Sequence, residues 1–181
     1  MKILSFDPSI SNTGLAVVDF RNFNSFNYST HLLRSPLRHR DKFQKQKSVE
    51  LILQRLLRQL EQFRKLSIPR EGVVVIEAPP LYVRVGRQGH HLNTLSILKL
   101  TAATWFWVGY FTKEGREVHL VPAPFSRKRY QQTSHATKAQ AYYALQSLGI
   151  PVNKMSEHER DALSLALYFV SNISDLTKRN L

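Results

Sequence analysis

The alternation of apolar and polar positions near the start of the chain predicts β-strands. Residues 2–7, 14–20 and 26–33 are strand-like, and the third segment alternates apolar and polar side chains with a period of two. Short polar segments connect the three, as in an antiparallel meander. Further along, "GVVVIEAPP" at 72–80 predicts a strand buried on both faces, and "REVHLVPAP" predicts a short strand near 116–121.

Apolar positions spaced three and four residues apart predict four helices, over about 42–66, 92–111, 134–148 and 157–172. For the first helix, the expected apolar face holds Val49, Ile52, Leu53, Leu56, Leu60 and Phe63, and the expected solvent face holds Lys45, Lys47, Arg55, Arg58 and Arg64. The order β-β-β-α-β-α-β-α-α predicts an α/β fold in which helices flank one mixed sheet. We expect one domain over residues 1–181.

The charge of the chain indicates a polyanionic partner. Its 26 Lys and Arg against 13 Asp and Glu give a net charge of +13, and nucleic-acid backbones are the usual partners of such a surplus. The plainer interpretation is a merely basic or ribosomal-type protein. The chain has no Cys, which excludes disulfides, thiolate catalysis and Cys-based zinc sites.

The chain shows no sign of export or of a membrane span. The first strand begins near residue 3, so we expect no signal or transit peptide. Apolar stretches such as "TAATWFWVGYF" are shorter than the ~20 residues that a membrane span requires. We therefore expect a soluble cytoplasmic protein without a membrane partner. The plain interpretation of Trp105, Phe106 and Trp107 is core packing.

Two acidic residues end predicted strands. Asp7 follows Ile3 and Ser5 on one face of the first strand, and its plainer interpretation is a turn in which its carboxylate accepts from the backbone of the next residues. Glu77 ends the strand that is apolar throughout, where a buried carboxylate requires a partner, a proton or a metal. A structural salt bridge is its plainer interpretation.

The segment "MSEHERDALSLALYF" adds a histidine and a third carboxylate. Ser156 and Glu159 form a capping box, so the helix begins at Glu157. His158 and Asp161 are three residues apart and lie on one face of its first turn. The helix is apolar nearly all round and is expected to be buried. A capping or surface role is the plainer interpretation of His158.

These residues would converge if the first and fourth strands are neighbours and the last helix crosses the same end of the sheet. Adjacent strands are ~4.8 Å apart. Three carboxylates and one imidazole, without Cys, suit Mg²⁺ or Mn²⁺ better than zinc. In a basic protein, such a set is typical of a phosphodiesterase with two metal ions.

The same motifs in the same order resemble the RuvC family of Holliday junction resolvases, within the ribonuclease H-like superfamily. The resemblance spans essentially the whole chain and rests on "FDPSISNTGLAVVD", "VVVIEAPP", "PAPFSRKRYQQTSHATKAQAYYAL" and "HERDALSLAL". It implies a ribonuclease H-like fold with a mixed five-stranded sheet. It also implies a homodimer that makes paired symmetric nicks in four-way DNA junctions during recombination and repair, leaving 5′-phosphate and 3′-hydroxyl ends.

The resemblance also assigns residue roles. The metal-binding and catalytic set becomes Asp7, Glu77, His158 and Asp161, with two Mg²⁺ ions for which Mn²⁺ substitutes. The implied DNA contacts are Tyr82 as a base-stacking residue, and Arg84, Arg87, Arg127, Lys128 and Lys138 as phosphate contacts. The helix that contains "LSILKLTAATWFWVGYF" is the implied dimer interface.

The chain departs from the family pattern in two places. Ser9 follows Asp7-Pro8 where the family usually has glycine, and Pro79-Pro80 follow the second acidic motif. This divergence indicates a phage, viral or organellar branch, with a bacterial or phage-infected cell as the expected setting. Two alternatives stay open: a related nuclease that cuts flaps, forks or RNA–DNA hybrids, and a non-catalytic nucleic-acid-binding module.

Overall fold

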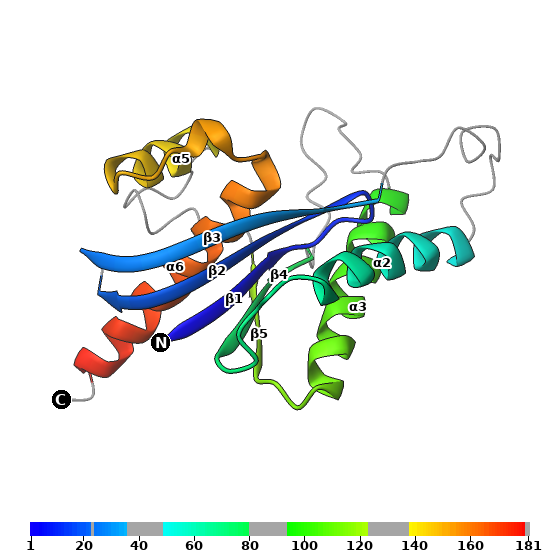
Figure 1. Ribbon diagram of the computed structural model, residues 1–181, viewed down its shortest axis with the longest axis horizontal. Coiled ribbons are helices and arrows are strands. Elements are labelled where there is room, and N and C mark those ends of the chain that lie inside the picture. The colour runs from blue at the N-terminus through cyan, green and yellow to red at the C-terminus, as the bar shows by residue number, and fades with distance from the viewer. Residues whose placement is uncertain (23, 36–48, 80–93, 123–137, 180–181) are drawn as a thin grey trace.

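A computed structural model describes residues 1–22, 24–35, 49–79, 94–122 and 138–179. Its five-stranded sheet is flanked by helices on both faces (Figure 1). The strands are β1 (Lys2–Asp7), β2 (Asn12–Asn22), β3 (Ser25–Arg34), β4 (Val73–Ala78) and β5 (Val118–Pro122). The helices are α2 (Val49–Arg64), α3 (Thr94–Lys113), α5 (Lys138–Ser147), α6 (Glu157–Arg179) and the short 3₁₀ helix η1 (Val152–Lys154).

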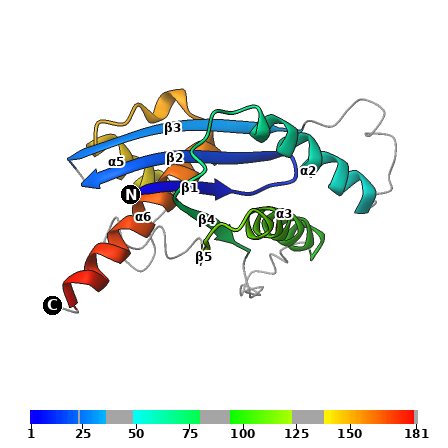
Figure 2. The same cartoon turned by 60° about the horizontal axis from the view of Figure 1, so that its bottom comes forward.

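The strands lie in the order β3-β2-β1-β4-β5 (Figure 2). β1, β2 and β3 form the expected antiparallel meander. β4 then pairs with β1 in parallel, and β5 pairs with β4 in parallel. The predicted mixed sheet, the element order and the neighbouring positions of the first and fourth strands are therefore confirmed.

Alternation along β1 divides the core into two layers. Ile3 packs toward α6, whereas Leu4 and Phe6 pack toward α2 and α3. Because successive side chains of a strand point to opposite faces, Asp7 belongs to the face of Ile3. The carboxylate that ends β1 therefore lies on the side of the sheet that α6 covers.

Helix α6 is buried as its sequence predicts. Its residues 162–167 are all buried, and it contacts β1, β2, β3 and β4. It continues to Arg179, beyond the predicted end near residue 172. No helix within the described ranges is long and apolar enough to cross a membrane.

Helix α2 differs from its prediction in which side chains it buries. Its buried apolar residues are Leu56, Leu60 and Phe63. Val49 and Leu53, expected in the core, are 81% and 47% exposed. Arg55, expected in solvent, is only 8% exposed because its guanidinium donates to the Ser35 carbonyl (2.7 and 3.0 Å) and to the Ser11 hydroxyl (2.8 Å).

Helix α3 contributes an aromatic core and also an exposed aromatic residue. Trp107 is fully buried, with its ring centroid 4.9 Å from that of Phe6 and 5.5 Å from that of Phe63. Trp105 is 54% exposed. The core interpretation is therefore confirmed for Trp107 and is wrong for Trp105, because the two side chains point in different directions around the helix.

We expect Trp107→Ala to lower the free energy of unfolding by about 3–5 kcal/mol, because it leaves a cavity among closely packed aromatic rings. Urea denaturation checks this value. Tyr143→Ala is the matched control, because Tyr143 is 70% exposed on α5 and its loss should change stability by less than about 0.5 kcal/mol. Equal effects of the two substitutions would contradict the described core.

Candidate active site

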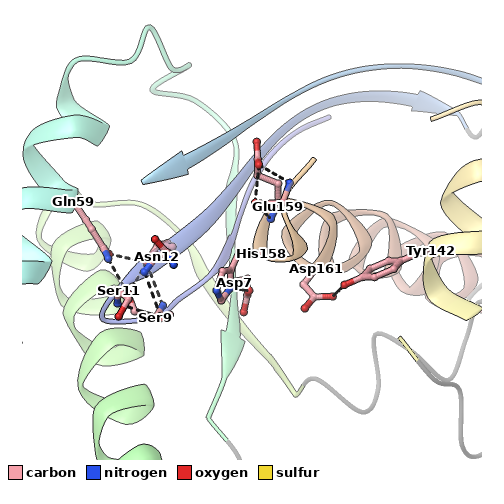
Figure 3. A network of polar contacts seen from close by, with 11 residues as sticks. Asp7, Ser9, Ser11, Asn12, Gln59, Tyr142, His158, Glu159 and Asp161 are labelled. Carbon is pink, nitrogen blue, oxygen red and sulfur yellow. Dashed lines mark hydrogen bonds and ion pairs between the residues drawn. The ribbon is translucent and has the colours of Figure 1, made fainter. Parts of the chain in front are cut away.

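A short polar contact at the C-terminal end of β1 joins Asp7 to His158. Oδ2 of Asp7 lies 2.5 Å from Nδ1 of His158, the second residue of α6 (Figure 3). Asp7 itself is 8% exposed. These two residues are 151 positions apart in sequence, so the contact depends entirely on how α6 packs on the sheet.

The pKa of His158 lies above its ordinary value. The largest cause is the hydrogen bond with Asp7, and the negative charges of Asp7, Asp161 and Glu157 act in the same direction, whereas burial opposes them. The charged imidazolium is therefore favoured when no cation is bound. A divalent cation that binds the imidazole ring of His158 would compete with the proton that makes the ring an imidazolium.

The first turn of α6 begins where the sequence predicts. The Ser156 amide donates to Oε2 of Glu159 at 2.9 Å, and the Glu159 amide donates to Oγ of Ser156 at 3.3 Å. This reciprocal pair is the predicted capping box. It fixes the start of the helix immediately before His158.

Gly14 allows α6 to lie directly on the sheet. It pairs with Asp7 across β1 and β2. A Cβ atom at this position would overlap the backbone carbonyl of His158 and stand 2.8 Å from the amide nitrogen of Glu159. Gly14 was not a candidate from the sequence, although a glycine inside a strand is the recognised signal of a close backbone approach.

The turn after Asp7 is closed by serine and threonine. Oγ of Ser9 accepts from the amides of Ser11 and Asn12 at 3.3 and 3.5 Å, and the Ser9 amide donates to Oγ1 of Thr13 at 3.2 Å. Ser9 therefore provides a side chain that closes this turn, while the Asp7 carboxylate contacts His158. Ser9 performs this role at the position where the family pattern has glycine.

Gln59 of α2 ties this turn to the opposite layer of helices. Its side chain is fully buried: Nε2 donates to the carbonyls of Ser9 and Ile10 at 3.0 and 3.1 Å, and Oε1 accepts from Oγ1 of Thr13 at 2.7 Å (Figure 3). Gln59 was not a candidate from the sequence. Its signal is a polar residue on the apolar face of a helix.

Asp161 accepts a hydrogen bond from a residue of α5. The Tyr142 hydroxyl donates to Oδ1 of Asp161 at 3.2 Å (Figure 3). Because Asp161 also contributes to the raised pKa of His158, the two α6 residues interact as their spacing predicts. Like Gly14 and Gln59, Tyr142 was not a candidate from the sequence.

Glu77 ends the strand beside β1. It directly follows Ile76, which pairs with Phe6, and two residues before it Val75 packs toward α6. Alternation therefore places Glu77 on the same face of the sheet as Asp7, and at the same C-terminal end of the two parallel strands. Glu77 is half-buried, rather than fully buried as its apolar strand predicted, because β4 loses its cover toward its C-terminal end.

The donor chemistry fits a hard divalent cation. Two aspartates, a glutamate and a histidine stand on β1, β4 and α6 at one end of the sheet, and the chain has no cysteine to favour zinc. Among the residues that the structure describes, however, no three acidic or histidine side chains are close enough to enclose a metal ion. Asp7 and His158 are in direct contact.

The expected DNA contacts fall mainly on parts of the chain that are not described. Tyr82, Arg84, Arg87, Arg127 and Lys128 lie outside the described residues. Lys138 is placed by its backbone as the first residue of α5. These six assignments stay predictions.

Comparison with solved structures identifies the fold. The T. thermophilus RuvC in complex with a Holliday junction substrate matches with a TM-score of 0.68 and 18% identity, over 93% of this chain and 92% of that one. A Thermus thermophilus RuvC structure matches at 0.59 with the same identity and coverage. The fowlpox virus Holliday junction resolvase matches at 0.46 with 14% identity, over 96% and 99%.

No protein-family model matches the chain, and no curated protein matches it in sequence. The solved structures therefore carry the comparison. They show that this chain has the ribonuclease H-like fold of the RuvC Holliday junction resolvases, as expected from its motifs.

We expect Gly14→Ala to lower the free energy of unfolding by at least about 2 kcal/mol, because backbone must move to admit the methyl group. The pKa of His158, measured by NMR titration of the metal-free protein, should fall toward 6.5 as the helix moves away from Asp7. Gly109→Ala on α3 is the control, since a Cβ there meets open space and a helical alanine stabilises by about 0.5–1 kcal/mol. An alanine at position 14 that changes neither quantity would contradict the close packing.

Proposed function

We propose that this protein is a divalent-metal-dependent endonuclease that resolves four-way DNA junctions. The observation that carries the proposal is the Asp7–His158 contact at the C-terminal end of β1, within a fold shared with RuvC. The net charge of +13 supports it, because a polyanionic substrate needs a basic protein surface. Carboxylates gathered within such a surface would repel DNA unless a cation offsets their charge.

The proposed ligands of the cation are Asp7, Glu77, His158 and Asp161. Bound Mg²⁺ or Mn²⁺, two ions in the proposal, would supply an activated water and stabilise the leaving 3′-oxygen. The contact of Asp7 with Nδ1 of His158 would favour the tautomer that carries its proton on Nδ1 and offers Nε2 to the cation. Hydrolysis would leave a 5′-phosphate and a 3′-hydroxyl.

The proposed contacts to DNA come from three regions. Tyr82 would stack on bases, Arg84 and Arg87 would neutralise phosphates nearby, and Arg127, Lys128 and Lys138 would hold the phosphates near the scissile bond. Lys138 opens α5, the helix whose Tyr142 reaches Asp161. This connection supports a position for α5 beside the proposed site.

We expect Asp7→Asn and Asp161→Asn each to lower cleavage of a synthetic four-way junction by about three orders of magnitude while junction binding persists. Cation-derived stabilisation is worth several kcal/mol, and each 1.36 kcal/mol is tenfold in rate. Cleavage in Mg²⁺ and binding by gel shift provide the two measurements. Asp19→Asn is the matched control, because Asp19 pairs with Lys2 at the opposite end of the same two strands. The Asp19→Asn protein should cleave the junction at the wild-type rate.

Matched duplex, Y-form, flap and RNA–DNA hybrid substrates separate junction resolution from the related nuclease activities. Symmetric paired cuts confined to the four-way junction would support the proposal. Preferential cutting of flaps or hybrids would favour the alternative nuclease. Binding without cleavage of any substrate in either Mg²⁺ or Mn²⁺ would indicate a non-catalytic module.

We also propose that the active protein is a homodimer, because two symmetric nicks require two sites. Exposed apolar side chains on α3 support this proposal: Leu98 and Trp105 are 59% and 54% exposed and stand seven residues apart, on one face of the helix. Tryptophan is also enriched at the centres of protein interfaces, where association buries a side chain that is exposed in the single chain.

Leu98→Glu combined with Trp105→Glu should convert the dimer into a monomer, because charges in an apolar interface lose their hydration. Light scattering after size-exclusion chromatography measures the mass against the 21.0 kDa of one chain. Tyr143→Glu is the control for adding a charge at an exposed aromatic position. A wild-type protein that is monomeric with and without junction DNA would refute the dimer.

A further inference from the structure

Tyr142 connects α5 to the proposed site. Its phenol donates a hydrogen bond to Oδ1 of Asp161 at 3.2 Å, across the space between α5 and α6 (Figure 3). Asp161 stands one helical turn from the start of α6 and is partly exposed. A hydrogen bond to a carboxylate restricts the orientations that its side chain can adopt.

The ring of Tyr142 is itself held in place. The guanidinium of Arg160 lies 4.1 Å from the ring centroid, within the range of a cation–π contact. Tyr142 therefore contacts two consecutive residues of α6, one through its ring and one through its hydroxyl. It also packs against the core layer between the sheet and α6.

Helix α5 is anchored independently of this hydrogen bond. Leu145 is fully buried and Ala141 is 4% exposed, so apolar packing on either side of Tyr142 holds the helix on the protein. Removing the Tyr142 hydroxyl should therefore leave α5 in position. The same change removes one hydrogen bond to Oδ1 of Asp161, so its effect on Asp161 can be separated from the anchoring of α5 in one variant.

We propose that Tyr142 is a positioning residue for Asp161, whose carboxylate it orients through the hydrogen bond to Oδ1 for binding a divalent cation at the C-terminal end of β1. This inference rests on the proposed function. Partners that orient metal-binding carboxylates affect metal affinity or activity about 10–100-fold when they are removed. A merely structural hydrogen bond would instead contribute about 1 kcal/mol to stability and nothing specific to cation binding.

The test is Tyr142→Phe in the full-length protein, with Mn²⁺ alone as the first probe. The affinity for Mn²⁺, measured from the free-ion electron paramagnetic resonance signal, should fall about tenfold. In junction cleavage, kcat should fall while KM for the junction stays unchanged, and raising the Mn²⁺ concentration should restore part of the rate. Urea unfolding of the metal-free protein measures any structural contribution separately.

Tyr143→Phe is the matched control, since it removes the same hydroxyl from the next residue, which is 70% exposed. It should leave Mn²⁺ affinity, kcat and stability unchanged. If Tyr142→Phe binds Mn²⁺ as the wild type does, the positioning role is refuted, even when the wild type cleaves junctions. A loss of stability without a change in Mn²⁺ affinity refutes it as well.

The outcomes for the wild type separate this inference from the proposed function. A wild-type protein that binds no Mn²⁺ and cleaves no junction refutes both. A wild-type protein that binds Mn²⁺ but cuts only another substrate refutes junction resolution. In that case, tenfold weaker Mn²⁺ binding by Tyr142→Phe still supports the positioning role.

Discussion

The contact between the first turn of α6 and the paired ends of β1 and β2 is the constraint on which the candidate site depends. A helix normally stands off a sheet by the length of its side chains, but Gly14 has none, so the His158 carbonyl lies against the strand. Gly14 is also the partner of Asp7 across the strands. The same close approach therefore brings the His158 ring within hydrogen-bonding distance of the Asp7 carboxylate.

Two other helices restrain this arrangement from opposite sides of the sheet. From the α2 layer, Gln59 binds the backbone of the turn that follows Asp7. From the α6 layer, Tyr142 of α5 binds Asp161. Both contacts join different elements of the fold, and both use neutral hydrogen-bonding groups, which avoid the cost of burying an extra charge. The site thus depends on all layers of the fold.

Helices α2 and α3 expose several apolar side chains on the surface of the protein and bury others in the core. Trp107 belongs to a closely packed aromatic core, whereas Trp105, two residues earlier, is exposed. On α2, Val49 and Leu53 are exposed and Arg55 is buried. Apolar residues that the fold leaves exposed are the most informative about association. Covering an exposed apolar surface with a partner lowers the free energy of the system.

The sequence by itself determined the order of the elements, the face of β1 on which Asp7 lies, and the residue at which α6 starts. Each follows from a local pattern: alternation along a strand, helical spacing, or the Ser156–Glu159 capping box. Only the tertiary structure decided that Asp7 contacts His158 and that Gly14 lies against the backbone of α6. It alone also showed the polar contacts of Gln59, Arg55 and Tyr142. The physical reason is that periodicity reports which side of an element is apolar, whereas a buried polar group is stable only with partners from distant segments, which no local pattern specifies.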